Sequence, residues 1–237
     1  MKIRLHLAAA LLALATASAA TAEQKAAKIA ITPGSAMAAI VFKAPDLPKP
    51  MGSYISSYKI GIKKYDAANQ ALQGGPYAGS LLLSARPSLF SQGYLVSDIK
   101  PGTYVITELS RQDLWALCFH DNSLQFTVKP GEVLYLGDFD AAFHVAELQS
   151  KAMSSGKIRV RQGSLAHFFD EVTPPKFTPG TTADLASVAA MVKSAMPSTT
   201  SVPQLAQFEP ARFGTGRDLF GLMRICGGYW TGKAKAK

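Results

Sequence analysis

The chain has 237 residues, a formal net charge of +9, and 48% hydrophobic against 17% charged residues. This length suits one ample domain, alone or with an extension, and it is enough to bury a hydrophobic core. After the N-terminal region no stretch is long and uncharged enough to cross a membrane, which argues against an integral membrane protein. The positive charge favours anionic neighbours such as lipid headgroups, cell-wall polymers or acidic proteins, but a basic soluble surface also explains it.

Residues 1–22 have the three-part pattern of a secretory signal peptide. A positively charged start is followed by a short apolar run over residues 5–15 and by small-x-small cleavage sites that end at Ala19 and Ala22. The alternative is a membrane anchor, but the run is shorter than the roughly 20 residues that a span needs. No cysteine follows the run, so a lipoprotein is not expected. We therefore expect an exported protein, periplasmic or extracellular.

From residue 36 onward the chain has the pattern of short β-strands separated by turns. Residues 58–65 (YKIGIKKY) alternate, so that Tyr58, Ile60 and Ile62 share one face. The expected strands are 37–42, 58–65, 81–83, 94–99, 103–110, 114–119, 123–129 and 133–139. About eight short strands with closely spaced turns favour an antiparallel β-sandwich over residues 36–172.

Two Lys-Pro-Gly turns organise the middle of the chain, at residues 100–102 and 129–131. Proline fixes φ at the second position of a turn, and glycine accepts the positive φ that a type II turn requires at the third. We therefore expect a tight turn at each of these places, between two strands that follow each other in the sequence.

Around these turns the sequence resembles a known family. Residues 95–106 (LVSDIKPGTYVI) and 126–139 (FTVKPGEVLYLGDF) look like the turn-and-strand motifs of transthyretin-like, or carboxypeptidase-regulatory-like, modules found in bacterial envelope proteins. The resemblance covers about residues 37–162. It implies a prealbumin-like β-sandwich, and such modules are usually non-enzymatic adaptors or binding units. Many of these envelope relatives are lipoproteins, and this chain lacks the lipid-bearing cysteine.

Residues 140–153 fit two interpretations. Asp140 could cap a helix through Met153, and the local propensity permits one. We favour a strand, because residues 156–162 (GKIRVRQ) alternate and would pair with it across the turn at 154–156.

Residues 173–230 form a C-terminal extension that begins with proline, threonine and glycine. Within it, residues 183–196 have the apolar stripe of one amphipathic α-helix, with Thr182 as its expected N-cap. Residues 231–237 alternate lysine and alanine and are expected to be a disordered tail.

The two cysteines, Cys118 and Cys226, are expected to form a disulfide in an oxidising compartment. Strand alternation puts Trp115, Leu117 and Phe119 on one face and Cys118 on the other, where the extension could lie. A bridge would fasten the extension and stabilise the fold by roughly 4–5 kcal/mol. The alternative is two separate thiols.

Few residues suggest chemistry. Asp138, Asp140 and His144 could bind a divalent metal, but acidic residues after a strand are also ordinary loop formers. The sequence has no G-x-S-x-G and no H-E-x-x-H, and residues 214–217 (GTGR) lack the spacing of a dinucleotide loop. No cofactor is expected.

Lys157, Arg159 and Arg161 form one ordered basic strip. Alternation places the three on one face of a strand, where they could contact an anionic polymer or a phosphate-bearing lipid. They could instead be a solvated face, or charges that guard a sheet edge. No aromatic residue lies between them, which argues against binding of single-stranded nucleic acid.

These patterns favour a non-enzymatic, exported cell-envelope protein that acts by binding or structural contacts. Its partner would be an anionic envelope component or another envelope protein. The alternative is a periplasmic hydrolytic or metal-dependent enzyme that uses the loops around Asp138–His144. The sequence does not identify the ligand.

Overall fold

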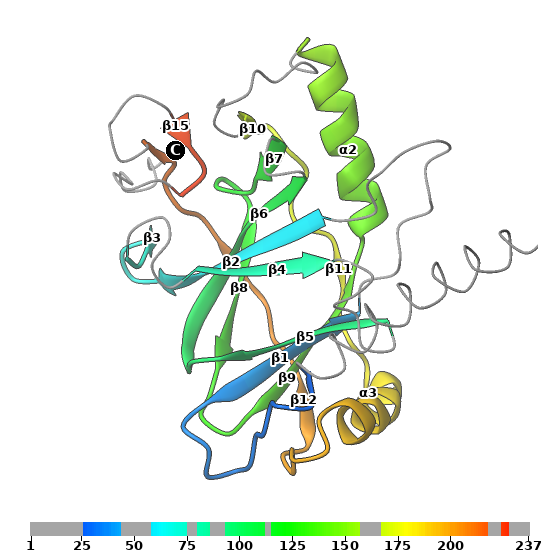
Figure 1. Cartoon of the computed structure of the whole chain (residues 1–237). Helices are drawn as coiled ribbons and strands as arrows, with labels where there is room; N and C mark the ends of the chain where they lie inside the picture. The colour runs from blue at the N-terminus through cyan, green and yellow to red at the C-terminus, as the bar shows by residue number, and fades with distance from the viewer. Residues whose placement is uncertain are drawn as a thin grey trace, which may run out of the picture.

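The structure is a computed structural model that describes residues 26–43, 58–74, 80–85, 93–111, 115–156, 167–217 and 224–227. The predicted signal peptide, basic strip and C-terminal tail lie outside these residues. Most of the described elements are strands, and Figure 1 shows the helices α2 and α3 beside them. The elements are β1 (Ala38–Lys43), β2 (Tyr58–Asp66), β3 (Ala71–Leu72), β4 (Ser80–Ala85), β5 (Tyr94–Ile99), β6 (Gly102–Arg111), β7 (Trp115–Cys118), β8 (Ser123–Val128), β9 (Val133–Phe139), α2 (Ala141–Ser154), β10 (His167–Phe169), β11 (Phe177–Thr178), α3 (Thr182–Ala195), β12 (Pro203–Leu205), β13 (Glu209–Ala211), β14 (Gly216–Arg217) and β15 (Arg224–Ile225).

Two sheets form the body of the protein. Sheet A has the order β11-β9-β1-β5, with β12 also pairing with β9. Sheet B has the order β10-β7-β6-β2-β3, with β4 on β2, β8 on β6 and β13 on β8. The predicted mainly-β sandwich class is confirmed. Most pairs are antiparallel, but both sheets are mixed, because β1–β9, β12–β9 and β10–β7 are parallel.

The main hydrophobic core lies between the two sheets. Sheet A contributes Ile40 and Phe42, and sheet B contributes the alternating residues Tyr58, Ile60 and Ile62. All five side chains are at most 1% exposed. The face predicted for residues 58–65 is therefore the core face, and burial of this apolar surface is what drives the sheets together.

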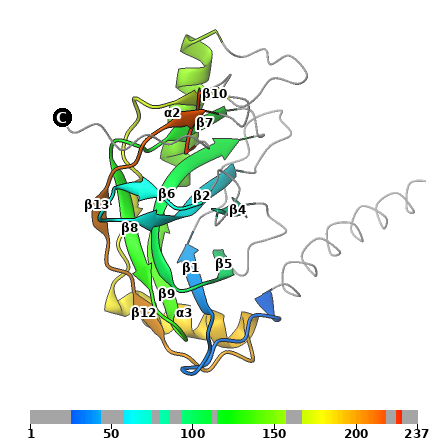
Figure 2. The ribbon, with the colours of Figure 1, turned by 90° about the vertical axis from the view of Figure 1, so that its left-hand side faces the viewer.

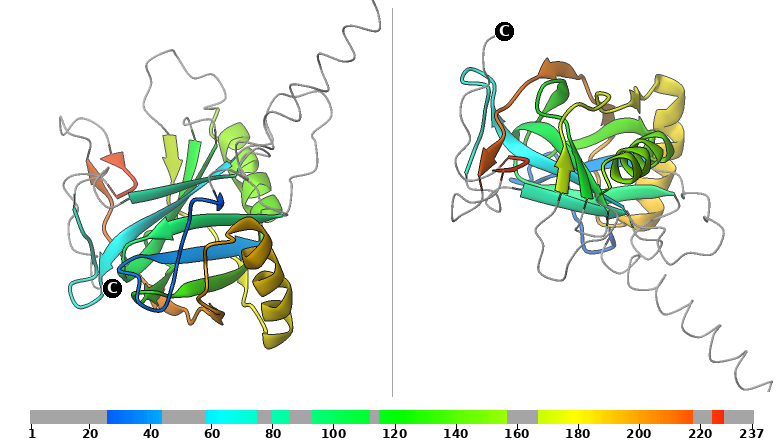
Figure 3. Two further views of the ribbon diagram at one scale, coloured as in Figure 1. Left: turned by 60° about the horizontal axis from the view of Figure 1, so that its bottom comes forward. Right: turned by 90° about the horizontal axis from the view of Figure 1, so that it is seen from above.

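A second core lies on the outer face of sheet A. Here Val41 and Val133 pack against Val188 and Val192 of α3. The strand β1 is thus buried on both faces, which explains its uninterrupted apolar sequence. Figure 3 shows α3 lying against this side of the sandwich, close to β1 and β12.

The strand favoured for residues 140–153 is wrong, because this segment forms the helix α2. Asp140 is its N-cap and accepts a hydrogen bond from the backbone N–H of Phe143 at 3.0 Å. The buried residues of α2 have helical spacing and are Ala141, His144, Val145 and Leu148. Three of these four join the core between the sheets, so tertiary burial selects the helix.

The helix predicted at residues 183–196 is confirmed as α3. It begins one residue earlier than expected, with Thr181 and not Thr182 as the N-cap. The Asp184 carboxylate accepts hydrogen bonds from both the backbone N–H and the hydroxyl of Thr181 at 2.7 Å, which fixes the first turn. Among the described residues, neither helix has the length and hydropathy of a membrane span.

After α3 the chain crosses from one sheet to the other. It adds β12 to sheet A and β13 to sheet B, and Figure 2 shows it running along one side of the molecule toward β14 and β15. We call residues 209–217 and 224–227 the C-terminal arm.

Candidate functional site

A disulfide fastens the C-terminal arm to sheet B. Cys118, at the end of β7, is bonded to Cys226, with an S–S distance of 2.13 Å and a Cα–Cα distance of 5.6 Å. Cys118 is fully buried and faces away from the core residue Leu117, as the strand alternation predicts. Neither cysteine of the chain is free.

Non-covalent contacts hold the first part of the arm on the same face. Phe213 is 1% exposed and packs with Tyr65 and Val105 in a third apolar cluster on the outer face of sheet B. Its backbone N–H donates to the carbonyl of His120 at 2.9 Å. The Tyr65 hydroxyl donates to the carbonyl of Arg212 at 2.7 Å. The arm is therefore an integral cover of this sheet.

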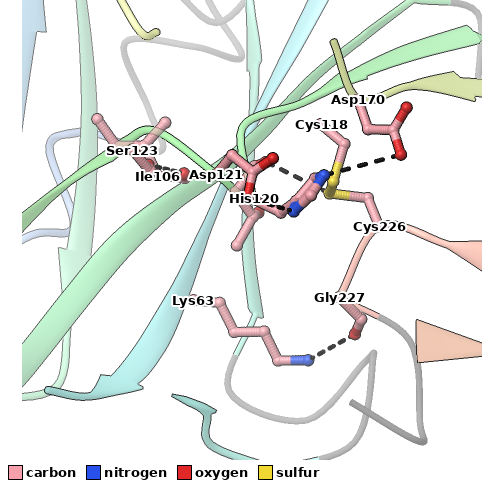
Figure 4. The surroundings of a disulfide bond; sticks show 10 residues. Lys63, Ile106, Cys118, His120, Asp121, Ser123, Asp170, Cys226 and Gly227 are labelled. Atoms are coloured by element: carbon pink, nitrogen blue, oxygen red, sulfur yellow. Dashed lines mark hydrogen bonds and ion pairs between the residues drawn. A yellow bond between two sulfur atoms is a disulfide. The ribbon is translucent and has the colours of Figure 1, made fainter. Parts of the chain in front are cut away.

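Beneath the end of the arm lies a buried lysine. Lys63 is 3% exposed, and its Nζ donates to the carbonyl oxygen of Gly227 at a long 3.5 Å. Figure 4 shows its side chain extending toward Gly227, next to the disulfide. Burial lowers the pKa of the Lys63 amine to about 8, and the nearby Glu108 carboxylate only partly offsets this effect. Alternation along residues 58–65 puts Lys63 on the face opposite Tyr58, Ile60 and Ile62, and nothing in the sequence indicates that another segment covers this face.

A charged cluster surrounds the turn between β7 and β8. The two ring nitrogens of His120 lie 3.6 Å from a carboxylate oxygen of Asp121 and 3.7 Å from one of Asp170. Arg212 of the arm lies 3.3 Å from the same Asp121 oxygen. These contacts tie the arm, the turn and the segment after β10 together.

An acidic pocket of about 440 Å³ opens beside this turn. Its carboxylates come from three separate places in the chain: the turn supplies Asp121, α2 supplies Glu147, and the segment after β10 supplies Asp170 and Glu171. Cys118 also lines the pocket. Four of its lining residues are carboxylates, which contrasts with the net positive charge of the whole chain. Sequence reasoning missed this pocket because it depends on α2 being a helix.

His144, one of the predicted metal candidates, is part of the packed interior of the protein. It is fully buried, with the rings of Phe119, Phe139 and Phe143 at centroid distances of 5.2 to 5.4 Å. Its Nε2 accepts the backbone N–H of Lys176 at 2.9 Å, so the ring proton lies on Nδ1.

The other side of the His144 ring faces a carboxylate. Its Nδ1 lies 3.4 Å from Oε2 of Glu147, while Oε1 of Glu147 accepts the N–H and hydroxyl of Thr173. Burial lowers the pKa of His144, and Glu147 opposes that shift. The pair links α2 to the segment that leads into β11, and the buried ring is enclosed by protein groups on both sides.

The remaining metal candidates lie in different environments. Asp138 is half-buried in β9 in register with Lys43 of β1, and burial raises the pKa of its carboxyl. Asp140 is exposed and caps α2. Within the described ranges, no three His, Cys, Asp or Glu side chains are grouped as metal ligands would be. The structure therefore does not bring Asp138, Asp140 and His144 together as a site.

Comparisons with known proteins give no assignment. The sequence matches no family model, and neither the curated proteins nor the solved structures include a significant match.

Proposed function

We propose that this protein is an exported, non-enzymatic envelope protein that acts through binding or structural contacts. The observation that carries the proposal is the disulfide between Cys118 and Cys226. Disulfides form and persist in the periplasm and outside the cell, whereas cytosolic thiols are kept reduced. The signal-like pattern of residues 1–22 gives the chain a route to such a compartment.

The burial of His144, a candidate catalytic or metal-binding residue, supports a non-enzymatic role. A general base or a metal ligand needs a ring nitrogen that can reach a substrate or an ion. Both nitrogens of His144 face partners inside the protein, and the ring is completely buried. We also propose that the sandwich is a transthyretin-like module, on the strength of the motifs at residues 95–106 and 126–139.

We propose an anionic envelope component as the partner. The net charge of +9, which is +7 once Lys2 and Arg4 are removed with the signal peptide (9 − 2 = 7), and the alternating Lys157, Arg159 and Arg161 support this choice. The test is to reverse all three charges to glutamate and to measure retention of the protein on isolated envelope fractions at low and at raised salt. We expect the variant to be lost from the fractions at a salt concentration that still retains the wild type, because screening weakens such contacts.

A matched control changes the same amount of charge elsewhere. Lys100, Lys129 and Lys193 are exposed in the structure, and their reversal to glutamate leaves the strip intact. The control should keep wild-type retention. Equal retention of the strip variant and the wild type would refute an anionic partner at the strip.

A further inference from the structure

The end of the C-terminal arm forms a small cover over Lys63. Gly227 is buried and has a φ of +64°, and the space beside it is filled by Leu72, whose Cδ1 would lie 2.7 Å from an added Cβ. The carbonyl of Gly227 accepts the hydrogen bond of Lys63. The bonded cysteine Cys226 directly precedes Gly227, so the cover and the disulfide are one continuous piece of chain (Figure 4).

Closing this cover removes water from an amine. The long 3.5 Å hydrogen bond to Gly227 replaces that water poorly, and burial lowers the pKa of Lys63 to about 8. At neutral pH the amine is therefore still mostly protonated, and its hydration favours the open position of residues 224–227. The disulfide is the covalent link that holds these residues against sheet B.

We propose that the Cys118–Cys226 disulfide is a redox latch that controls access to Lys63. When a dithiol reduces the disulfide, residues 224–227 leave sheet B and Lys63 becomes an accessible amine, which is a modification site for acylating and carbonyl reagents. The latch requires only the disulfide and the buried lysine, so it is independent of the partner proposed above.

The chemistry of opening is thiol–disulfide exchange. Cys226 is partly exposed whereas Cys118 is fully buried, so a thiolate of the dithiol attacks Sγ of Cys226. The S–S bond breaks, and Cys118 leaves as a thiolate and takes a proton. The second thiol of the dithiol then attacks the mixed disulfide and releases Cys226 as a thiol. Two electrons and two protons pass to the protein, and the dithiol becomes a disulfide.

The test is pulsed acetylation of the oxidised, full-length protein with an N-hydroxysuccinimide ester, before and after treatment with dithiothreitol. Peptide mass spectrometry gives the acetylation rate of each lysine. We expect the rate at Lys63 to rise about tenfold or more on reduction, as local opening exposes it, while the exposed Lys129 and Lys193 keep their rates. The variant Cys226→Ser should show the fast rate at Lys63 without any reductant. An unchanged rate at Lys63 in both experiments would overturn the proposal.

A second measurement separates local opening from unfolding of the sandwich. Amide hydrogen exchange of β1 and β9, which lie in the other sheet, should keep its protection after reduction. Loss of that protection together with exposure of Lys63 would also overturn the latch, because the disulfide would then support the whole fold and not the cover alone.

Discussion

Replacement of Lys63 by methionine should stabilise the protein at neutral pH. Methionine is unbranched, apolar and similar in length, so it can occupy the same space beneath the arm without a charge. The substitution removes a protonated amine that is 3% exposed and has one long hydrogen bond, to Gly227. Replacement of a poorly solvated buried charge by an apolar group is often stabilising.

The expected gain follows from the pKa of Lys63, which burial lowers from 10.5 to about 8. A pKa that is lower by one corresponds to about 1.4 kcal/mol of free energy. Burial of the protonated amine therefore costs about 3 kcal/mol at neutral pH. Loss of the weak contact to Gly227 reduces the net gain to about 2 kcal/mol. Between pH 8 and 10.5 the unfolded chain binds more protons at this position than the folded chain, so the stability of the wild type rises through that window. The advantage of Lys63→Met should therefore disappear toward pH 10.5.

The assay is equilibrium unfolding in urea of the oxidised wild type and variant at about pH 7 and about pH 10. The difference between the two proteins cancels groups that titrate in both, such as the tyrosines. The exposed Lys129 provides the control, and Lys129→Met should change the unfolding free energy by less than about 0.5 kcal/mol. A Lys63→Met protein that is less stable than the wild type at pH 7, or whose advantage is equally large at pH 10, would show that burial of the charged amine does not destabilise the fold.

Three further substitutions test other contacts. Burial lowers the pKa of His144 below its ordinary 6.5, so the unfolded chain takes up a proton that the folded chain does not. Stability should therefore fall as pH drops below about 6.5, and His144→Gln should lose this pH dependence in urea unfolding. Gly131 has a φ of +70°, and an added Cβ would lie 2.6 Å from a backbone carbonyl of the N-terminal segment. Gly131→Ala should thus cost at least about 1 kcal/mol, whereas Gly34→Ala, which meets no atom within 4 Å, should be nearly neutral in thermal melts. Asp140→Ala should cost about 1 kcal/mol and reduce the helical circular dichroism of α2, while Asp140→Asn should keep the cap; equal stability of the two variants would contradict the capping role.

Much of the sandwich could be predicted because its strands alternate. The face of Tyr58, Ile60 and Ile62 points into the core, as their spacing indicates. The pairing of strands could not be predicted in the same way. The parallel pairs β1–β9 and β12–β9 join segments far apart in sequence, and no local turn specifies them.

The error at residues 140–153 has a similar cause. The alternation after residue 156 favours a hairpin with the segment before it. The helix forms instead because Asp140 caps its first turn and one of its faces is buried in the core. The stripe of buried residues from Ala141 to Leu148 was visible in the sequence and would have identified the helix.

In the candidate site, too, only the features that depend on local sequence could be predicted. The position of Cys118 followed from strand alternation, because Leu117 and Phe119 had to face the core. The burial of Lys63 did not follow, because a polar residue on an alternating strand is normally solvated. Only the fold brings Gly227 over it, and only the fold gathers the carboxylates of the acidic pocket from three segments.

The proposed export and the disulfide can be tested together by thiol labelling of the full chain, expressed in bacteria with its own N-terminus and recovered by cell fractionation. The protein is denatured without reductant and treated with a maleimide. We expect the protein in the exported fraction with no labelled thiol and with a peptide that joins Cys118 to Cys226. A form without residues 2–22 should stay in the cytoplasm with both thiols labelled. Recovery of the full chain in the cytoplasm, or labelling of both cysteines in the exported protein, would contradict this expectation.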